Sequence, residues 1–407
     1  MSRSCFADFH IHSKYSGATS DKMVFENIAR EAEKKGLDIV GTGDILHPKW
    51  SDSIEKDLQK ITEGIYRHPY HETKFLPTTE VEDSENIHHL IIIPSLSKVE
   101  ELREELKPFS DDLYVDGRPT VDLEGFEIVE KVSDVGGLIG PCHAFTPWTS
   151  IYKEHDSLSG CYNGQLENVD FLELGLSADT SLADKISELK ELTFLSNSDA
   201  HSPWPDRLGR EVNVFDVSDF SVEEVFERIR EGDFRRNIGL DPKMGRYHLT
   251  ACSECHEKYS VEEAVSSSWR CDECDGPIKK GVFDRICELS NGEGSNSPDF
   301  RPEYQDIFPL SKIIQLALGY SSSRSKSVQK FWDLLVEEFE DELTVLTESP
   351  VSEISEISDG KIGEMIRCYR EGDIDVAPGG GGKYGELVEP EGFNGKFGDD
   401  QKSIEDF

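Results

Sequence analysis

Short apolar runs alternate with amphipathic stretches through residues 1 to about 235 of this chain. The runs, each interpreted as a buried strand, are Cys5–Phe9, Leu37–Gly41, Lys74–Thr78, His89–Ile93, Gly137–Gly140, Phe171–Leu174 and Thr193–Leu195. Helical patterns lie between or after them at Val24–Lys35, Ser97–Lys107, Leu123–Ser133 and Val222–Glu231. Such alternation predicts a parallel sheet with crossover helices. About seven repeats, with polar side chains after nearly every strand, favour a closed barrel, whose loops gather at one mouth.

The pattern changes after Asp241-Pro242. Residues 243–280 are rich in turns and cysteines, and helical patterns return at 310–319, 325–343 and 360–371. From Ala377 onward the chain is rich in Gly, Asp and Glu, which is typical of a flexible end. The sequence therefore predicts a barrel over 1–240, a small cysteine-bearing module over 241–290, a helical region over 291–376 and a flexible tail over 377–407.

Potential metal ligands cluster where the apolar runs end. They are His10 and His12, Asp44 and His47, Glu80, His88 and His89, His143, and Asp199 and His201. At a strand end, the side chains of residues i and i+2 point to the same face of the sheet, which suits ligands of neighbouring ions. A single histidine is more often a hydrogen-bonded structural residue than a ligand. Together at strand ends, these side chains indicate a site where divalent ions activate water.

Four cysteines have the spacing of a structural zinc site. Cys252-x2-Cys255 is followed, after fifteen residues, by Cys271-x2-Cys274. Four protein ligands leave no open position on the ion, so this zinc would not be catalytic. Its role stays open between folding a module that lacks a core and presenting a surface to a partner.

Acidic residues dominate the charge: 82 acids against 43 bases give a net charge of −39. We interpret this as the acidic surface of proteins that work in molar internal salt, where screening reduces self-repulsion. At ordinary salt the same charge would instead indicate a protein that avoids nucleic acid. The chain shows no leader-like start and no apolar run approaching about 18 residues. We therefore expect a soluble cytoplasmic protein without a membrane partner.

Three stretches contain no acid at all: Gly137–Lys153, Pro242–Ser253 and Pro309–Trp332. Random clustering and burial could produce each of them singly, but together they mark surfaces that a polyanion could approach. The candidate nucleic-acid contacts in them are Trp148, Tyr152, Lys243, Arg246, Lys312, Arg324, Lys326 and Lys330.

The order HxH, Asp, Glu, His, His and a terminal DxH resembles the polymerase and histidinol phosphatase (PHP) superfamily of phosphoesterases. The resemblance implies a distorted (β/α)₇ TIM-like barrel, here followed by a zinc ribbon and a C-terminal helical domain. It implies two to three ions (Zn, Mn or Mg). His10, His12, Glu80 and Asp199 would be catalytic and would hold the first ion, His89 and His143 would share Glu80 with a second, and Asp44 with His201 would hold a third. His89 is preferred to His88 because it directly precedes the apolar residues of its strand. His47 departs from the family's pattern and stays open as a ligand or a substrate contact.

The whole layout is similar to the endonuclease Q family of archaeal DNA repair nucleases. The segments that carry this similarity are Asp8–Ser16, Gly41–Pro48, Ser196–Ser202, Tyr247–Cys252, Lys279–Arg285 and Pro378–Gly385. The resemblance implies cleavage 5′ of a deaminated base, uracil or hypoxanthine, leaving 3′-hydroxyl and 5′-phosphate ends. Such a base has to leave the stack, and the aromatic candidates to stack on it or wedge into the duplex are Tyr15, Trp148, Tyr152 and Trp204.

Two other interpretations stay open at the level of sequence. The first is a phosphoesterase for a small phosphate ester, with the ribbon used for assembly. The second is a DNA-binding or partner-binding protein with a degenerate barrel, against which the near-complete ligand set argues. If the protein is a repair enzyme, a sliding clamp is a further candidate partner, although we find no convincing clamp-binding peptide at the C-terminus.

Overall fold

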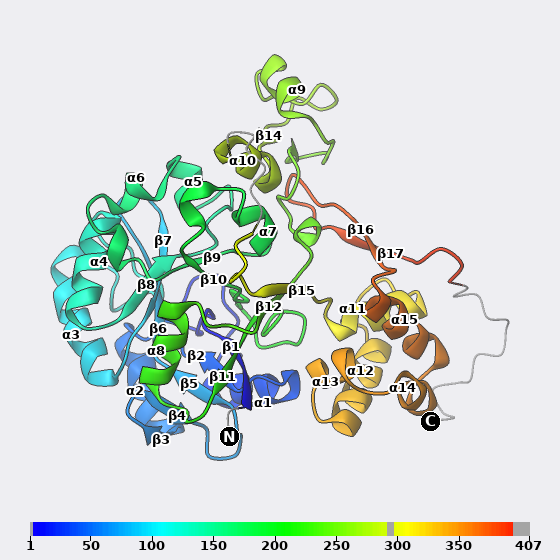
Figure 1. Ribbon diagram of the computed structural model, residues 1–407, viewed down its shortest axis with the longest axis horizontal. Helices are drawn as coiled ribbons and strands as arrows, with labels where there is room; N and C mark the ends of the chain where they lie inside the picture. Colours follow the sequence, from blue (N-terminus) through cyan, green and yellow to red (C-terminus); the bar gives the residue numbers. More distant parts are fainter. Residues whose placement is uncertain (1–2, 291–296, 394–407) are drawn as a thin grey trace. The chain divides into compact units, whose positions relative to one another are not determined.

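The apolar runs of the first 240 residues become strands in the computed structural model, which describes residues 3–290 and 297–393 (Figure 1). The chain divides into two units. The first contains the chain up to Phe308 together with Pro378–Glu386, and the second contains Pro309–Ala377 and the chain from Leu387 onward. None of the helices in the described residues combines the length and the apolar composition that crossing a membrane requires.

The strands of the barrel form three groups. Their bounds are β1 Arg3–Asp8, β2 Ile39–Gly41, β3 Gln59–Thr62, β4 Ile65–Arg67, β5 Lys74–Leu76, β6 Thr78–Glu82, β7 His88–Ile92, β8 Leu138–Pro141, β9 Phe171–Glu173, β10 Thr193–Leu195, β11 Val212–Val217, β12 Arg236–Gly239 and β15 Glu303–Asp306. The largest sheet has the order β15-β12-β11-β1-β2-β5-β4-β3, and beside it lie β6-β7-β8 and the pair β9-β10. Each predicted run overlaps one of these strands.

Backbone hydrogen bonds between these groups close a ring of strands. Ile45 N, after β2, donates to Thr78 O of β6 at 3.1 Å, and Asp170 N, before β9, donates to Ile139 O of β8 at 2.9 Å. His12 N, after β1, donates to Ala200 O, after β10, at 3.0 Å. The ring is a distorted (β/α)₇ barrel, which confirms the predicted fold class.

The prediction of a parallel sheet was wrong for β11, which runs antiparallel to β1 and β12, and for β7, which runs antiparallel to both β6 and β8. Only Asp83–Ile87 separates β6 from β7, and a link this short makes a hairpin rather than a parallel crossover. The first residue of β7 therefore lies beside the last residue of β6.

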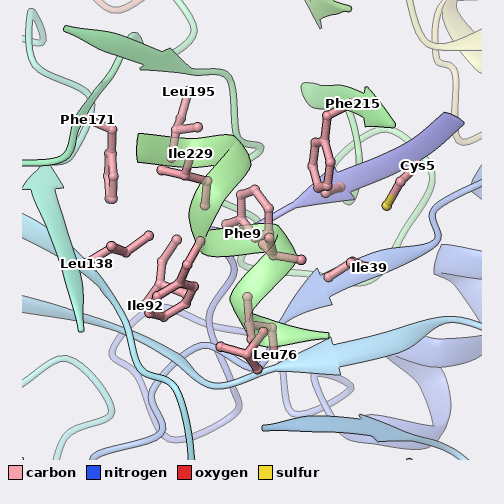
Figure 2. Close-up of a cluster of buried hydrophobic side chains, with 14 of the residues drawn as sticks. Cys5, Phe9, Ile39, Leu76, Ile92, Leu138, Phe171, Leu195, Phe215 and Ile229 are labelled. Atoms are coloured by element: carbon pink, nitrogen blue, oxygen red, sulfur yellow. The ribbon is translucent and has the colours of Figure 1, made fainter. Parts of the chain in front are cut away.

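Helices surround the ring (Figure 1). They are α1 Phe25–Lys35, α2 Pro48–Asp57, α3 Leu96–Leu106, α4 Gly125–Asp134, α5 Ile151–Glu154, α6 Leu158–Tyr162, α7 Thr180–Ala183 and α8 Val222–Glu231. The main core gathers side chains from the strands and from α8, among them Phe9, Leu138, Leu195 and Ile229 (Figure 2). Burying each such side chain stabilises the fold by about 1.5–3 kcal/mol.

The four-cysteine module consists of β13 Ala251–Cys252, α9 Val261–Ser266, β14 Ile278–Lys279 and α10 Val282–Leu289. Strands β13 and β14 pair antiparallel. Its apolar centre contains little beyond Ala264 and Ile278, with Tyr259 and Trp269 packed against the cysteines. A centre this small needs a further constraint, which a zinc ion bound by the cysteines would provide.

The glycine-rich segment Pro378–Glu386 is ordered, so the prediction of a flexible tail from residue 377 was wrong for these residues. Gly379 N donates to Lys243 O at 2.8 Å, and Gly382 N donates to Arg246 O at 3.0 Å. Glycine is needed for close approach: Gly381 has φ +59°, and a Cβ there would lie 2.1 Å from Cys252 O. Residues 394–407, the last part of the predicted tail, lie outside the described residues.

The predicted boundary of the helical region was also wrong, because Glu303–Asp306 belongs to the barrel. This strand, β15, pairs parallel with β12. Just before it, the Arg301 guanidinium forms an ion pair with Asp184 at 2.8 Å and donates to Leu192 O at 2.7 Å. It also lies over the Phe194 ring at 3.6 Å. Arg301 thus fixes the chain that follows the cysteine module to the barrel. Residues 291–296 are outside the described part.

The second unit is helical, as predicted. It contains α11 Leu310–Leu318, α12 Lys326–Phe339, α13 Glu342–Thr347, α14 Val351–Ile357 and α15 Gly360–Glu371, with the two-stranded sheet of β16 Asp375–Ala377 and β17 Glu386–Val388. The carboxylate of Glu342 is fully buried and accepts hydrogen bonds from Leu310 N at 3.0 Å and Trp332 Nε1 at 2.5 Å. This carboxylate ties the starts of α11 and α13 to α12.

We predict that Asp184→Ala destabilises the first unit by about 3–5 kcal/mol, because it leaves the buried Arg301 charge without its partner. The side chains of Arg301 and Asp184 are 3% and 0% exposed. Chemical denaturation measures the change. As the control, Glu72→Ala removes an exposed partner of Arg67 and should cost less than about 1 kcal/mol. Equal stability of the two variants would contradict the role given to Arg301.

Candidate functional site

Three of the predicted ligands occupy left-handed backbone conformations at the strand ends. Asp44 follows β2 with φ +51°, His143 follows β8 with φ +30°, and Asp199 follows β10 with φ +47°. Such conformations are strained for residues other than glycine and persist where the surroundings hold them. Here they turn the chain after each strand, so that the side chains meet at one end of the barrel.

Glu80 lies at the centre of the cluster. Its Oε1 is 2.7 Å from His88 Nδ1, 3.3 Å from His143 Nε2 and 3.7 Å from His10 Nε2. Its Oε2 is 3.3 Å from His12 Nε2. Oε1 therefore faces three imidazoles and Oε2 faces a fourth, so both oxygens of this carboxylate lie among ligand nitrogens and could bind different ions.

Asp199 is the second shared carboxylate. Its Oδ1 is 3.3 Å from His12 Nε2, 3.8 Å from His10 Nε2 and 3.4 Å from His201 Nδ1. The side chains of Asp199 and His201 are each 33% exposed, whereas those of His10 and His12 are buried. Asp199 thus lies at the boundary between the buried ligands and solvent, where a substrate could reach the site.

Several buried ligand atoms in this cluster make no hydrogen bond. They are His10 Nε2, His12 Nε2, His88 Nδ1 and Glu80 Oε1. A buried polar atom without a partner costs free energy, and its usual explanation is a ligand or an ion. In addition, three groups of three residues each have their ligand atoms within 4.8 Å of one another. These groups are His10/His12/Glu80, Glu80/His88/His143 and His12/Asp199/His201. Nitrogen and oxygen donors in these groups fit divalent zinc or manganese.

Two further carboxylates orient the first two histidines. Glu173 Oε1 lies 2.9 Å from His10 Nδ1, and Asp44 Oδ1 lies 3.0 Å from His12 Nδ1. Each carboxylate accepts from Nδ1–H, so that Nε2 is the ring nitrogen that faces the place of an ion. Asp44 Oδ2 also accepts from Ser13 N at 2.6 Å. The structure therefore corrects the predicted role of Asp44 as a ligand: it supports His12, and His201 groups with His12 and Asp199 instead.

The preference for His89 over His88 was wrong. In the β6–β7 hairpin His88 is paired with Glu82, so it lies on the same face as Glu80, two residues away. His89 points to the other face, where Nε2 lies 3.0 Å from Asp83 and Nδ1 lies 2.7 Å from Tyr162 Oη. The sequence argument failed because it did not include the reversal of β7.

The charges of the cluster stabilise one another. Burial by itself lowers the pKa of His10, but Glu173 and Glu80 outweigh it, so this pKa lies well above its usual value. Burial likewise raises the pKa of Glu80, yet His88 and His10 hold that pKa well below its usual value. The buried carboxylate is therefore ionised and available to a cation.

His47 remains open between its two predicted roles. It stacks on Tyr15 with ring centroids 4.2 Å apart, and its buried Nδ1 has no hydrogen-bond partner. Burial lowers the pKa of His47, so the ring is neutral at neutral pH. A neutral imidazole with a free nitrogen is able either to hold an ion or to contact a substrate.

Sequence reasoning missed Glu173 and Arg118. Glu173 ends the apolar run of β9, and an acid inside such a run was a usable signal. Arg118 lies in the loop between α3 and α4, and its Nη1 is 3.4 Å from Glu80 Oε2. Its side chain is 31% exposed, so it faces the open side of the cluster. A single arginine in a loop has no periodicity, and nothing in the sequence marked it.

The four cysteines converge as their spacing predicted. Their sulfur atoms all lie within 4.8 Å of one another, with Cys252 Sγ 3.5 Å from Cys274 Sγ and Cys255 Sγ 3.4 Å from Cys271 Sγ. Tyr259 Oη donates to Cys271 Sγ at 3.2 Å, and this bond lowers the pKa of that thiol to about 6. Sulfurs at these separations fit the four corners of a tetrahedral zinc site.

The predicted nucleic-acid contacts of the barrel differ in exposure. Trp148 is 47% exposed, but Tyr152 is buried and its hydroxyl donates to Glu188 at 2.8 Å. Tyr152 therefore cannot contact DNA, and that prediction was wrong. Lys243 and Arg246 are exposed beside the glycine-rich segment.

The other predicted contacts lie in the second unit. Lys312 of α11 is half-buried and donates to Gln315 at 3.4 Å. Arg324, Lys326 and Lys330 are exposed at the start of α12. Their contact with DNA stays a prediction.

Two family models match parts of the chain. One, described as the MJ0043 C-terminal domain, matches residues 309–373, and one described as PHP-associated matches residues 180–234. A protein of Bacillus subtilis, YqxK, is 31% identical over 409 residues that cover 94% of this chain and 98% of YqxK. MJ0043 of Methanocaldococcus jannaschii is 46% identical over 258 residues, which are 62% of this chain. The match covers 32% of that protein, so this chain spans about a third of its length.

Two solved structures match nearly the whole chain. The lesion-specific endonuclease PfuEndoQ of Pyrococcus furiosus is 45% identical, with a TM-score of 0.90 and coverage of 96% of both chains. A complex of Endonuclease Q with a 27-mer duplex substrate, which has an abasic lesion at the active site, is also 45% identical. Its TM-score is 0.91, and the match covers 96% of this chain and 98% of that one.

We predict that His88→Gln lowers the bound metal by one ion per chain, whereas His89→Gln retains it, because only His88 faces Glu80. Elemental analysis of the dialysed proteins measures the content, and circular dichroism confirms that both variants fold. Loss of an ion from the His89 variant alone would contradict the assignment.

Proposed function

The chain belongs to the endonuclease Q family, and we propose that it is a DNA repair endonuclease that hydrolyses the phosphodiester 5′ of a deaminated base, uracil or hypoxanthine. The products are 3′-hydroxyl and 5′-phosphate ends. Membership of this family makes the chain a metal-dependent endonuclease of the PHP kind. The choice of lesion and the position of the cut are the parts that the proposal adds.

The observation that carries the proposal is the set of buried, unpartnered ligand atoms around Glu80. Glu80, His10, His12, His88, His143, Asp199 and His201 would hold two to three divalent ions. When bound, these ions supply an activated water and neutralise charge on the phosphate. The cysteine cluster would hold a structural zinc outside this chemistry.

The protein's own residues prepare this site before substrate arrives. Glu173 and Asp44 fix the orientation of His10 and His12. Asp199 and His201, both partly exposed, face the side from which a phosphodiester can enter. Because the carboxylates and imidazoles are already in place, little reorganisation is needed during the reaction.

Arg118 adds a positive charge that can bind the substrate phosphate. Its guanidinium contacts Glu80 but remains 31% exposed, so some of its N–H donors face solvent. A guanidinium can donate two parallel hydrogen bonds to phosphate oxygens. We assign to Arg118 the stabilisation of negative charge on the phosphate during cleavage.

DNA is the partner in this proposal. A deaminated base is read outside the stack, since its distinguishing edge is paired inside the duplex. The complex of Endonuclease Q with duplex DNA supports a DNA substrate for this chain as well. The net charge of −39 weakens phosphate contacts, so activity has to be measured at both low and molar salt.

We predict that the protein, supplied with Mn²⁺, Mg²⁺ or Zn²⁺, cuts an end-labelled duplex at a single position, 5′ of one uracil or hypoxanthine. Asp199→Asn should reduce incision more than about 100-fold, since loss of even a supporting residue of a metal site costs about 10–100-fold. The matched control is Asp216→Asn in β11, at the opposite end of the barrel.

Three results would contradict the proposal. They are absence of incision in every metal and salt condition, equal cutting of undamaged duplex, and turnover of a small phosphomonoester in place of DNA. The last result would favour the small-ester phosphoesterase.

We predict that Arg118→Ala slows single-turnover incision by about 100- to 1,000-fold, the usual effect of removing a donor that stabilises developing charge. Metal content should stay unchanged, and Arg118→Lys should restore part of the rate. If Arg118 acts instead by holding Glu80 in position for the ions, the alanine variant will lose metal in step with activity.

A further inference from the structure

Three cations and three aromatic rings form a continuous stripe on the first unit. We call it the aromatic–basic stripe, and in order along it are Arg207, Tyr384, Arg246, Tyr247, Trp148 and Lys279. These residues come from five separate parts of the chain, and printed contacts join each one to the next.

The first half of the stripe is built around Tyr384 of the glycine-rich segment. Arg207 Nη1 donates to Tyr384 Oη at 3.3 Å, and the Arg246 guanidinium lies 5.2 Å from the centre of the Tyr384 ring. Both arginines therefore flank one ring. The ring itself is 42% exposed, so much of it is free to make a further contact.

The second half is built around Trp148. Tyr247 lies between Arg246 and Trp148: its ring is 5.8 Å from the guanidinium and 6.2 Å from the indole, edge to face at 74°. Lys279 Nζ lies 4.6 Å from the centre of the indole. Trp148 is 47% exposed, which is unusual for the largest apolar side chain.

Two members of the stripe, Arg207 and Trp148, lie on loops that carry proposed metal ligands. Trp148 follows His143 in the loop after β8, and Arg207 follows His201 in the loop after β10. Lys279 belongs to β14 of the cysteine module. A DNA strand that lies along the stripe would therefore run between the cysteine module and the loops that carry the proposed metal ligands.

The charge of the stripe contrasts with that of the chain. Among the described residues, none of the ion pairs involves Arg207, Arg246 or Lys279, and the chain as a whole has a net charge of −39. Cations without acidic partners on an acidic protein are available to a polyanion. Their alternation with aromatic rings is the pattern of surfaces that bind unpaired nucleotides, with phosphates on the cations and bases on the rings.

A purely structural role explains part of the stripe. Arg246 Nε donates to Gly382 O at 2.9 Å, which holds the glycine-rich segment in place. Such a clasp needs neither an exposed indole nor an unpaired lysine over it. The exposed faces of Trp148 and Tyr384 are therefore the part that calls for a ligand.

We propose that the aromatic–basic stripe binds unpaired DNA nucleotides adjacent to the phosphodiester that is cut, with bases stacked on Trp148 and Tyr384 and phosphates on Arg207, Arg246 and Lys279. This inference rests on the proposed endonuclease function and adds to it the surface that holds the opened strand.

The test measures binding of a fluorescent single-stranded oligonucleotide and of a uracil-containing duplex to the Asp199→Asn protein, which we expect to bind DNA without cutting it. Adding Trp148→Ala should weaken binding to the single strand by about 5- to 160-fold, the range for loss of one stacked base. Trp148→Phe should restore most of it. Arg246→Ala should reduce the slope of log K against log salt by about 0.7, the value for one phosphate contact on a single strand.

Two matched controls lie at the opposite end of the barrel. Tyr70→Ala removes an 86% exposed ring before β5, and Arg235→Ala removes an exposed cation before β12. Neither should change affinity or salt slope. Zinc content and thermal unfolding of each variant show whether it still folds, and Lys279→Gln provides a milder second variant.

The outcomes separate the two proposals. If the unmodified protein cuts lesion DNA but affinity and salt slope are unchanged in the Trp148, Arg246 and Lys279 variants, the stripe is a structural clasp and this inference is wrong. If the unmodified protein cuts no DNA, the proposed function fails, whatever the stripe binds. Loss of duplex binding without loss of single-strand binding would also overturn the assignment of unpaired nucleotides.

Discussion

The site depends on one constraint, a set of buried hydrogen bonds between the end of β1 and the chain that follows β10. We call this set of hydrogen bonds the joint. Asp8, fully buried, accepts hydrogen bonds from Ser198 N and Gly209 N, both at 3.1 Å. Asn197 Oδ1 accepts from Phe9 N at 3.0 Å. Buried backbone groups have to be paired, so these bonds admit only one register between the two strand ends. That register closes the barrel and brings the HxH motif (His10 and His12) beside the terminal DxH motif (Asp199 and His201).

The same joint explains why so much charge can be buried in one place. Glu80 and Asp199 would repel each other if the histidines between them were absent or rotated. Glu173 prevents such rotation for His10 and also accepts from Asn197 Nδ2 at 2.8 Å, so the orienting carboxylate belongs to the joint itself. Strain at Asp199 is held by the same network. Closing the barrel and preparing the ligands are therefore one structural event.

Much of the fold was predictable because the spacing of apolar residues along the chain indicates which residues are buried. The seven apolar runs became strands, and the spacing of the cysteines was sufficient to place Cys252 beside Cys274. The direction of β7 was not predictable from periodicity, because a short apolar run looks the same in a parallel and an antiparallel strand. Because β7 is reversed, His88 and not His89 faces Glu80. Arg118 and the ordered segment around Gly381 depend on contacts far apart in sequence, which no local pattern contains.

The backbone at Tyr152 connects the cysteine module to the segment that carries the proposed metal ligand His143. Tyr152 O accepts from Arg285 Nε of α10 at 2.8 Å, and His155 O accepts from Arg285 Nη2 at 3.0 Å. The loop after β8 thus carries His143 at one end and holds the module at the other. Because this loop is fixed at both ends, Lys279 of the module is kept over Trp148. A module with a core this small can keep its place only if its own fold is fixed, so an ion held by the four cysteines would matter to the site without any part in the chemistry.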